Sequence, residues 1–144
     1  MRKLTIAIDF DGTCVKNEFP YIGEDIGAVP VLKEITDAGH KLILFTVRSD
    51  NKHLKPNSSD PRIKNISGDF ESDAVKWFEE NNIPLYSKQK DPEQHLWTLS
   101  PKVFADIIID DTALGIPLKT DSSGGKPYVD WGKVRDILKD KGVI

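Results

Sequence analysis

The chain has almost no cysteine, since Cys14 is the only one among its 144 residues. No disulfide can form within it, which argues against the small secreted proteins that depend on disulfide bonds for stability. The amino terminus also lacks the apolar core and the small-residue cleavage site of a signal peptide. We therefore expect a reducing compartment and a cytoplasmic location.

Long apolar runs and an excess of positive charge are missing as well. No apolar stretch approaches the roughly 20 residues that a membrane-spanning helix needs. The net charge of −3 leaves no basic stripe for nucleic acid. With 38% hydrophobic and 30% charged residues, the composition is that of an ordinary globular protein. The sequence predicts one domain over residues 1–144 with a small-molecule partner, and neither a membrane nor a nucleic-acid partner.

The most informative segment is Lys3–Thr13, an apolar strand that ends in D-F-D-G-T. Side chains alternate along a strand, so Asp9 and Asp11 should point to one side and Phe10 to the other. The carboxyl edge of an α/β sheet is where ligands bind, and two like charges there indicate a bound cation, a shared proton or a strained reactive group. Gly12 lets the backbone turn sharply beside the ligand. A turn that is merely capped by two acids is the alternative.

Two later strands also end in polar residues. Residues 41–50 contain an apolar strand that ends in Thr46, with Arg48 shortly after it. The hydroxyl and guanidinium groups of these two residues suit an oxyanion. Each is also an ordinary residue at a strand end. A third apolar strand leads into Asp110 and Asp111, and carboxylate oxygens are ligands that Mg²⁺ prefers.

A lysine near these acids would neutralise charge between them and a phosphate. We select Lys102, which comes just before the third strand, with Lys88 and Lys90 as the other candidates. A solvated surface lysine is the alternative for Lys102.

The order of these motifs resembles the haloacid dehalogenase superfamily, with D-x-D-x-T, then Thr, then Lys, then paired acids, over nearly the whole chain. The resemblance implies that Asp9 is a nucleophile that takes up a phosphoryl group, and that Asp11 protonates the leaving group and later activates water. It also implies a Mg²⁺ ion held by Asp9, the backbone carbonyl of Asp11 and Asp110. Asp111 would then act indirectly, by orienting a metal-bound water or the lysine.

The same resemblance implies the contacts to the substrate. Thr46 would hydrogen-bond the transferring phosphoryl group, and Lys102 would steady the nucleophile and the phosphate. We place Gly12, Thr13 and Arg48 among the substrate-binding residues, with Arg48 clamping a second anionic group or the rim of the phosphate site. A surface ion pair is the alternative role for Arg48.

These residues predict a Mg²⁺-dependent phosphomonoester hydrolase. Hydrolysis through an aspartyl phosphate needs an acid to expel the alcohol and a base to activate water, which Asp11 can supply in turn. Dehalogenating members of the superfamily lack this second Asp. A phosphotransferase with the same residues and a catalytically silent protein that keeps the metal site remain alternatives. A phosphoacceptor signalling domain is disfavoured because its adjacent acids come first, whereas here they come last.

The alternation of strands and helices predicts an α/β fold with a three-layer, Rossmann-like, doubly wound and mainly parallel sheet. Helices are expected over Pro30–Ala38 and Phe70–Asn81, and from a cap at Asp130 through about Lys141. A short strand is expected near Leu85–Ser87.

Two connections are candidates for function. Residues 14–25 should form a short flap beside the site, and residues 49–68 form a long polar loop that we regard as a specificity loop. Neither is large enough for a separate cap domain. In the superfamily an open site goes with large substrates or with oligomers that cover it, so a homo-oligomer is one possible partner arrangement.

Overall fold

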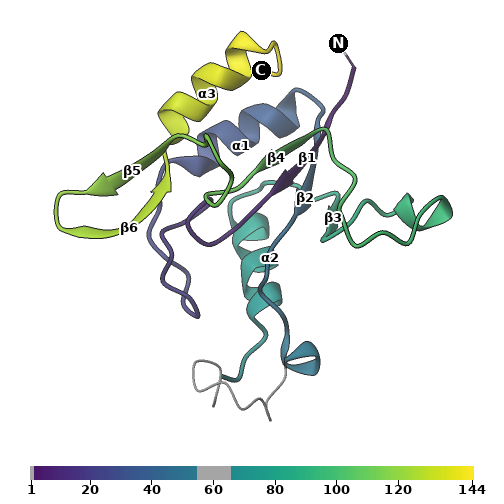
Figure 1. The fold of residues 1–144 in the computed structure, drawn as a ribbon, viewed down its shortest axis with the longest axis horizontal. Coiled ribbons are helices and arrows are strands. Elements are labelled where there is room, and N and C mark those ends of the chain that lie inside the picture. Colours follow the sequence, from purple (N-terminus) through teal and green to yellow (C-terminus); the bar gives the residue numbers. More distant parts are fainter. Residues whose placement is uncertain (1, 55–65) are drawn as a thin grey trace.

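The centre of the molecule is a parallel sheet of four strands in the order β3-β2-β1-β4 (Figure 1). The computed structural model describes residues 2–54 and 66–144. The order reverses beside β1, because β2 and β3 extend the sheet on one side and β4 returns on the other. The predicted α/β fold with a doubly wound parallel sheet is thereby confirmed. The strands are β1 (Thr5–Ile8), β2 (Lys41–Leu44), β3 (Ser87–Lys88) and β4 (Ile107–Ile109).

The central strands are short apolar runs whose last residues lie in register. Ile8 at the end of β1 pairs with Leu44 of β2 and with Ile109 of β4. The chain therefore leaves all three strands at the same edge of the sheet. Asp9 and Asp110 follow directly at that edge, as the strand pattern predicts.

Three α-helices of the described residues pack around this sheet, and each lies close to its predicted range. Asp130 caps the last one, because its side chain accepts a hydrogen bond from the backbone N–H of Lys133. The predicted strand near residues 85–87 is shorter than expected and begins at Ser87. The helices are α1 (Ala28–Asp37), α2 (Phe70–Glu80) and α3 (Trp131–Asp140).

The two faces of the sheet are covered differently. Ile6, Ile8, Leu42 and Leu44 belong to one buried cluster that also contains side chains of all three helices. On the opposite face, Ala7 and Ile43 pack against Val103, which comes from the connection between β3 and β4. Within the described residues the third layer is this connection, with one 3-10 turn at Gln94–Leu96, rather than an α-helix.

A two-stranded antiparallel hairpin follows β4, formed by β5 (Leu118–Asp121) and β6 (Gly124–Val129). It braces the turn after β1, since the backbone N–H of Val129 donates to the carbonyl of Gly12 at 3.0 Å. The indole N–H of Trp131, at the start of α3, donates to the carbonyl of Thr13 at 2.7 Å. The end of the chain thus holds its first motif in place.

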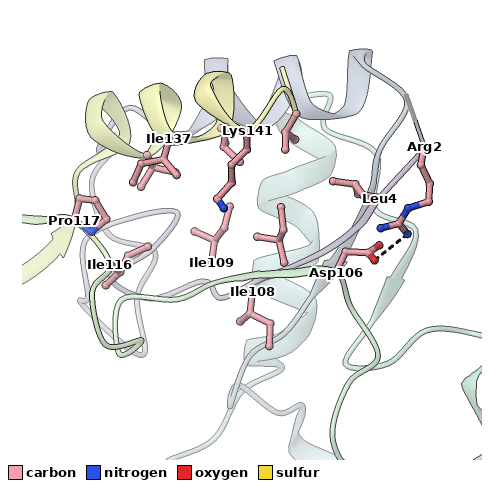
Figure 2. A pocket seen from close by; sticks show the side chains of 13 residues that line it. Arg2, Leu4, Asp106, Ile108, Ile109, Ile116, Pro117, Ile137 and Lys141 are labelled. Carbon is pink, nitrogen blue, oxygen red and sulfur yellow. Dashed lines mark hydrogen bonds and ion pairs between the residues drawn. The ribbon is translucent and has the colours of Figure 1, made fainter.

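A hollow of about 510 Å³ lies between β4 and α3 and is lined mainly by isoleucine, leucine and valine side chains (Figure 2). At its border Asp106 pairs with Arg2 at 3.0 Å. None of the described helices is both long and apolar enough to cross a membrane.

Candidate functional site

Three carboxylates meet where the chain leaves β1 and β4. Asp9, Asp110 and Asp111 each present one oxygen, and these oxygens lie within 4.8 Å of one another. The neighbouring strands cause this convergence, because Ile8 and Ile109 are paired in register and both chains continue into acids. The site offers oxygen donors only, which suits a hard divalent cation such as Mg²⁺.

The proximity of these acids changes their protonation. Burial, a hydrogen bond with Asp111 and the charge of Asp110 together raise the pKa of Asp9 from 3.8 to about 8. Burial also raises the pKa of Asp111, and the neighbouring Asp110 adds to that shift. In the absence of a cation, the carboxylates of the cluster therefore retain a proton near neutral pH, and a divalent ion that binds there would displace it.

Asp111 lies within the cluster, whereas the sequence analysis gave it an indirect role. That expectation came from the resemblance and assumed that only one of two adjacent side chains can face the ion. β4 ends at Ile109, however, and both acids lie in the turn that follows. Asp110 shapes this turn by accepting hydrogen bonds from the N–H and the hydroxyl of Thr112, at 2.9 and 2.8 Å.

Thr13 holds two of the acids. Its hydroxyl lies 2.9 Å from Oδ2 of Asp9, to which it donates, and it accepts the backbone N–H of Asp111 at 3.0 Å. The side chain is completely buried. The expectation that Thr13 binds substrate is therefore corrected, because the hydroxyl is occupied within the protein.

Gly12 makes room for Asp111. Its φ of +80° lies in the left-handed region, and a Cβ atom at this position would lie 2.4 Å from Oδ2 of Asp111. The predicted sharp turn is present. The absence of a side chain here also lets a carboxylate approach the backbone, and the placement of Gly12 among the substrate-binding residues stays a prediction.

Asp11 stands apart from the cluster and is held by Arg48. Both of its carboxylate oxygens accept hydrogen bonds, from Nε and from Nη2 of Arg48, at 2.7 Å each. This is the two-point geometry that makes arginine–carboxylate pairs specific. The proposed role of the Asp11 backbone carbonyl as a metal ligand stays a prediction.

Arg48 is buried rather than placed on a rim, with 2% of its surface exposed. All five N–H groups of its guanidinium are occupied, so none is left for a substrate oxygen. Both sequence-based roles, substrate clamp and surface ion pair, are thereby corrected. Besides the two oxygens of Asp11, the acceptors are the backbone carbonyls of Pro20, Tyr21 and Phe70.

Thr46 lies at the same edge, after β2. Its hydroxyl accepts the backbone N–H of Arg48 at 3.0 Å, and the Gln89 side chain bonds both its N–H and its carbonyl. A hollow of about 610 Å³ opens here, and Lys88 lines it together with Thr46. The ammonium group of Lys88 pairs with Glu71 at 3.1 Å.

Lys102 lies elsewhere. It precedes β4, whose acids follow the opposite end of the strand, and it lines a different hollow with Trp97 and Phe104. The ammonium group of Lys90 donates to the carbonyl of Ser100. Of the three candidate lysines, Lys88 shares a hollow with Thr46.

A solved structure is similar to this chain along almost its whole length. It is described as the structure of the conserved protein coded by a locus from Bacteroides thetaiotaomicron. The two chains are 34% identical, with a TM-score of 0.69 over 97% of this chain and 93% of the other. The chain belongs to the family of this conserved protein. That description names no activity, and neither a family model nor a curated protein matches the chain.

In this member of the family, the flap over residues 14–25 is ordered around Val15, which bridges to both Asp11 and Asp25. Its Pro20 and Tyr21 carbonyls reach Arg48, so the flap adjoins the site. Of the candidate specificity loop over residues 49–68, residues 55–65 lie outside the described part of the chain.

Sequence reasoning missed Gln89 and misjudged Arg48. Gln89 has a φ of +64°, a conformation that non-glycine residues rarely adopt, and it fixes the backbone of Thr46. No local pattern signals this role. The pair of hydrogen bonds between Arg48 and Asp11 cannot be read from the sequence either. An arginine that follows a strand has the same sequence pattern whether its side chain is buried or lies at the rim of a site.

Proposed function

We propose that this protein is a Mg²⁺-dependent phosphomonoester hydrolase that works through an aspartyl phosphate on Asp9. The observation that carries the proposal is the cluster of Asp9, Asp110 and Asp111 with a fourth acid, Asp11, held separately two residues after Asp9. The motif order supports it, because it resembles that of the haloacid dehalogenase superfamily.

The reaction divides the work between Asp9 and Asp11. A carboxylate oxygen of Asp9 attacks phosphorus, and the bond to the leaving oxygen breaks. Asp11, which is a carboxylate in its pair with Arg48, takes up one proton from solvent when the phosphate dianion binds and gives it to the leaving oxygen. Water then attacks the phosphorus of the aspartyl phosphate and gives a proton to Asp11. The bond between phosphorus and Asp9 breaks, inorganic phosphate leaves, Asp11 releases its proton to solvent, and both acids return to the carboxylate state.

The cluster would hold Mg²⁺ through Asp9, Asp110 and Asp111, and the ion would offset the negative charge of the acids and of the phosphate. Thr13 binds Oδ2 of Asp9, which leaves Oδ1 as the attacking atom. The same hydroxyl positions Asp111 through its backbone N–H. The nucleophile is thus held by the protein before substrate arrives.

Thr46 and Lys88 complete the phosphate site in this proposal. The Thr46 hydroxyl accepts a hydrogen bond from Arg48, so its own proton is free to donate to a phosphoryl oxygen. We assign the charge-neutralising lysine to Lys88, which lines the hollow beside Thr46, in place of Lys102.

The test is hydrolysis of p-nitrophenyl phosphate with and without Mg²⁺, by the parent protein and by Asp9→Asn. We expect Mg²⁺-dependent turnover by the parent and none by Asp9→Asn. Asp106→Asn is the matched control, since it changes an acid at the opposite end of β4 and should keep the activity. Hydrolysis by folded Asp9→Asn at the parental rate would refute the proposal. Phosphate transfer to an added alcohol, measured against release to water, distinguishes a phosphotransferase.

A further inference from the structure

Arg48 connects three parts of the chain that lie far apart in sequence. It donates to Asp11 after β1, to the carbonyls of Pro20 and Tyr21 in the flap, and to the carbonyl of Phe70 at the start of α2. The rings of Phe10 and Phe19 each lie 5.1 Å from its guanidinium carbon. The guanidinium is thus surrounded by the protein and closed to solvent.

The charge of Arg48 is compensated by a single side chain. A buried cation is tolerated only when it is paired and its donors are satisfied. Among the described residues, Asp11 is the one acid within ion-pair distance of Arg48. The three carbonyls satisfy the remaining donors without adding a negative charge.

We propose that Arg48 is a positioning residue for Asp11. We also propose that it couples the orientation of the Asp11 carboxylate to the placement of the flap over residues 14–25, because one guanidinium group binds both. The inference rests on the proposed function, in which Asp11 moves protons. Arg48 itself has no free donor for the substrate. It acts by fixing the orientation of the Asp11 carboxylate at two points, and the same guanidinium holds the flap at Pro20 and Tyr21.

The planar fork is essential to this role. Two parallel hydrogen bonds restrict both the place and the plane of a carboxylate, whereas the ammonium group of lysine is a point charge that leaves the plane free. Arg48→Lys therefore keeps a positive charge opposite Asp11 but loses the orientation and the contacts with the flap.

The experiment compares Arg48→Lys with Arg135→Lys. Arg135 forms the same kind of fork with Glu34, at 2.7 and 3.0 Å, but on the partly exposed surface between α1 and α3. We measure kcat and KM for p-nitrophenyl phosphate, which has a good leaving group, and for benzyl phosphate, which has a poor one. Folding of each variant is checked by circular dichroism and thermal unfolding.

We expect Arg48→Lys to lower kcat for benzyl phosphate about 10²-fold, within the range of general acid–base catalysis, and to lower kcat for p-nitrophenyl phosphate much less. Arg135→Lys should change neither. A purely structural role of Arg48 would lower both rates by the same factor, through the folded fraction. Equal losses on the two substrates, or no loss, would overturn the inference.

A double-variant cycle tests whether Arg48 acts through Asp11. In an Asp11→Asn background, Arg48→Lys should bring no further loss of kcat on benzyl phosphate, because the group that it positions is already disabled. Additive losses would contradict the inference. An inactive parent protein would instead refute the proposed function, so the two failures are distinguishable.

The fork can also be observed if Arg48→Lys does not fold. In the ¹⁵N-labelled parent protein, the Nε–H of Arg48 should exchange slowly with water, and its resonance should shift in Asp11→Asn. The backbone N–H resonances of Tyr21 and Ile22 in the flap should shift with it. The coupling would be overturned if the Nε–H proton exchanged rapidly with water, or if the flap resonances did not shift in Asp11→Asn.

Discussion

Gly12 and Asp111 are in such close contact that no other residue type fits at position 12 without displacing the acid. A Cβ atom on Gly12 would lie 2.4 Å from Oδ2 and 2.9 Å from Cγ of Asp111. The turn after β1 and the turn after β4 are therefore built against each other. The placement of Asp111 beside Asp9 depends on the absence of a side chain at position 12.

Gly12→Ala should therefore weaken Mg²⁺ binding by about 10–100-fold, as the loss of supporting groups around a metal does. Gly115→Ala is a matched control, because Gly115 has a similar φ of +90° and open space at its Cβ position. Both variants should lose about 1–2 kcal/mol of stability through left-handed strain. Calorimetric titration with Mg²⁺ should separate them, and equal affinities would show that Asp111 does not need this contact.

The Thr13 hydroxyl gives a second prediction about the same cluster. Thr13→Val keeps the shape but removes the donor to Asp9 and the acceptor for the Asp111 N–H. An unsatisfied buried N–H costs about 1–3 kcal/mol, so the melting temperature should fall. Thr13→Ser keeps the hydroxyl and should retain Mg²⁺ affinity. If Val and Ser variants bind Mg²⁺ alike, the hydroxyl does not organise the cluster.

The metal-free protein should become less stable as pH rises from about 4 to 8. The folded pKa of Asp9, about 8, lies above its ordinary value of 3.8, so in this window the folded chain keeps a proton that the unfolded chain has released. The raised pKa of Asp111 acts in the same direction. The lowered pKa values of Asp50 and Asp106 have their effect below about pH 4 and do not oppose this trend.

Thermal unfolding at pH 5.5 and pH 8, with and without Mg²⁺, measures this effect. We expect the melting temperature of the metal-free protein to fall by at least about 2 °C between these pH values, which is a shift of a fraction of a kcal/mol. Mg²⁺ should stabilise more at pH 8, because it competes with fewer protons. Asp9→Asn should flatten the metal-free profile, and an unchanged slope in that variant would assign the proton elsewhere.

The sheet and helices were predictable because each depends on a local pattern. Three apolar runs marked β1, β2 and β4, and helical spacing marked α1, α2 and α3. The β5–β6 hairpin was not predicted, because its strands are largely exposed and lack an apolar alternation. A third layer was predicted, but its composition was not, because the connection from β3 to β4 that forms it is held by hydrogen bonds of the buried Gln94 side chain and not by a helical pattern.

The site was predictable only where strand ends determine it. Asp9 and Asp110 follow paired strands, so their meeting follows from topology. The roles of Arg48 and Asp111 depend on side-chain directions beyond the ends of the strands, where alternation no longer applies. The order of the motifs predicts a catalytic lysine between the second and the last motif. It does not say how far that lysine lies from the acids in space, so it could not distinguish Lys88 from Lys102.

Lys88 and Lys102 therefore provide the last prediction. If Lys88 neutralises the phosphate, Lys88→Met should lower kcat/KM for p-nitrophenyl phosphate by about 10²-fold, comparable to the loss of one preorganised donor in a phosphate or oxyanion site. Lys102→Met removes the same charge at a hollow lined by Trp97 and Phe104, and it should leave the rate unchanged.

We expect both variants to keep the fold and a stability near that of the parent protein. Lys88 is half exposed, and surface pairs such as its contact with Glu71 contribute at most about 1 kcal/mol. A loss of rate in Lys88→Met can therefore be assigned to the site, provided that its melting temperature stays near that of the parent. If Lys102→Met loses the activity and Lys88→Met keeps it, the connection between β3 and β4 must fold back over the acids when substrate binds, and the original assignment of Lys102 is restored.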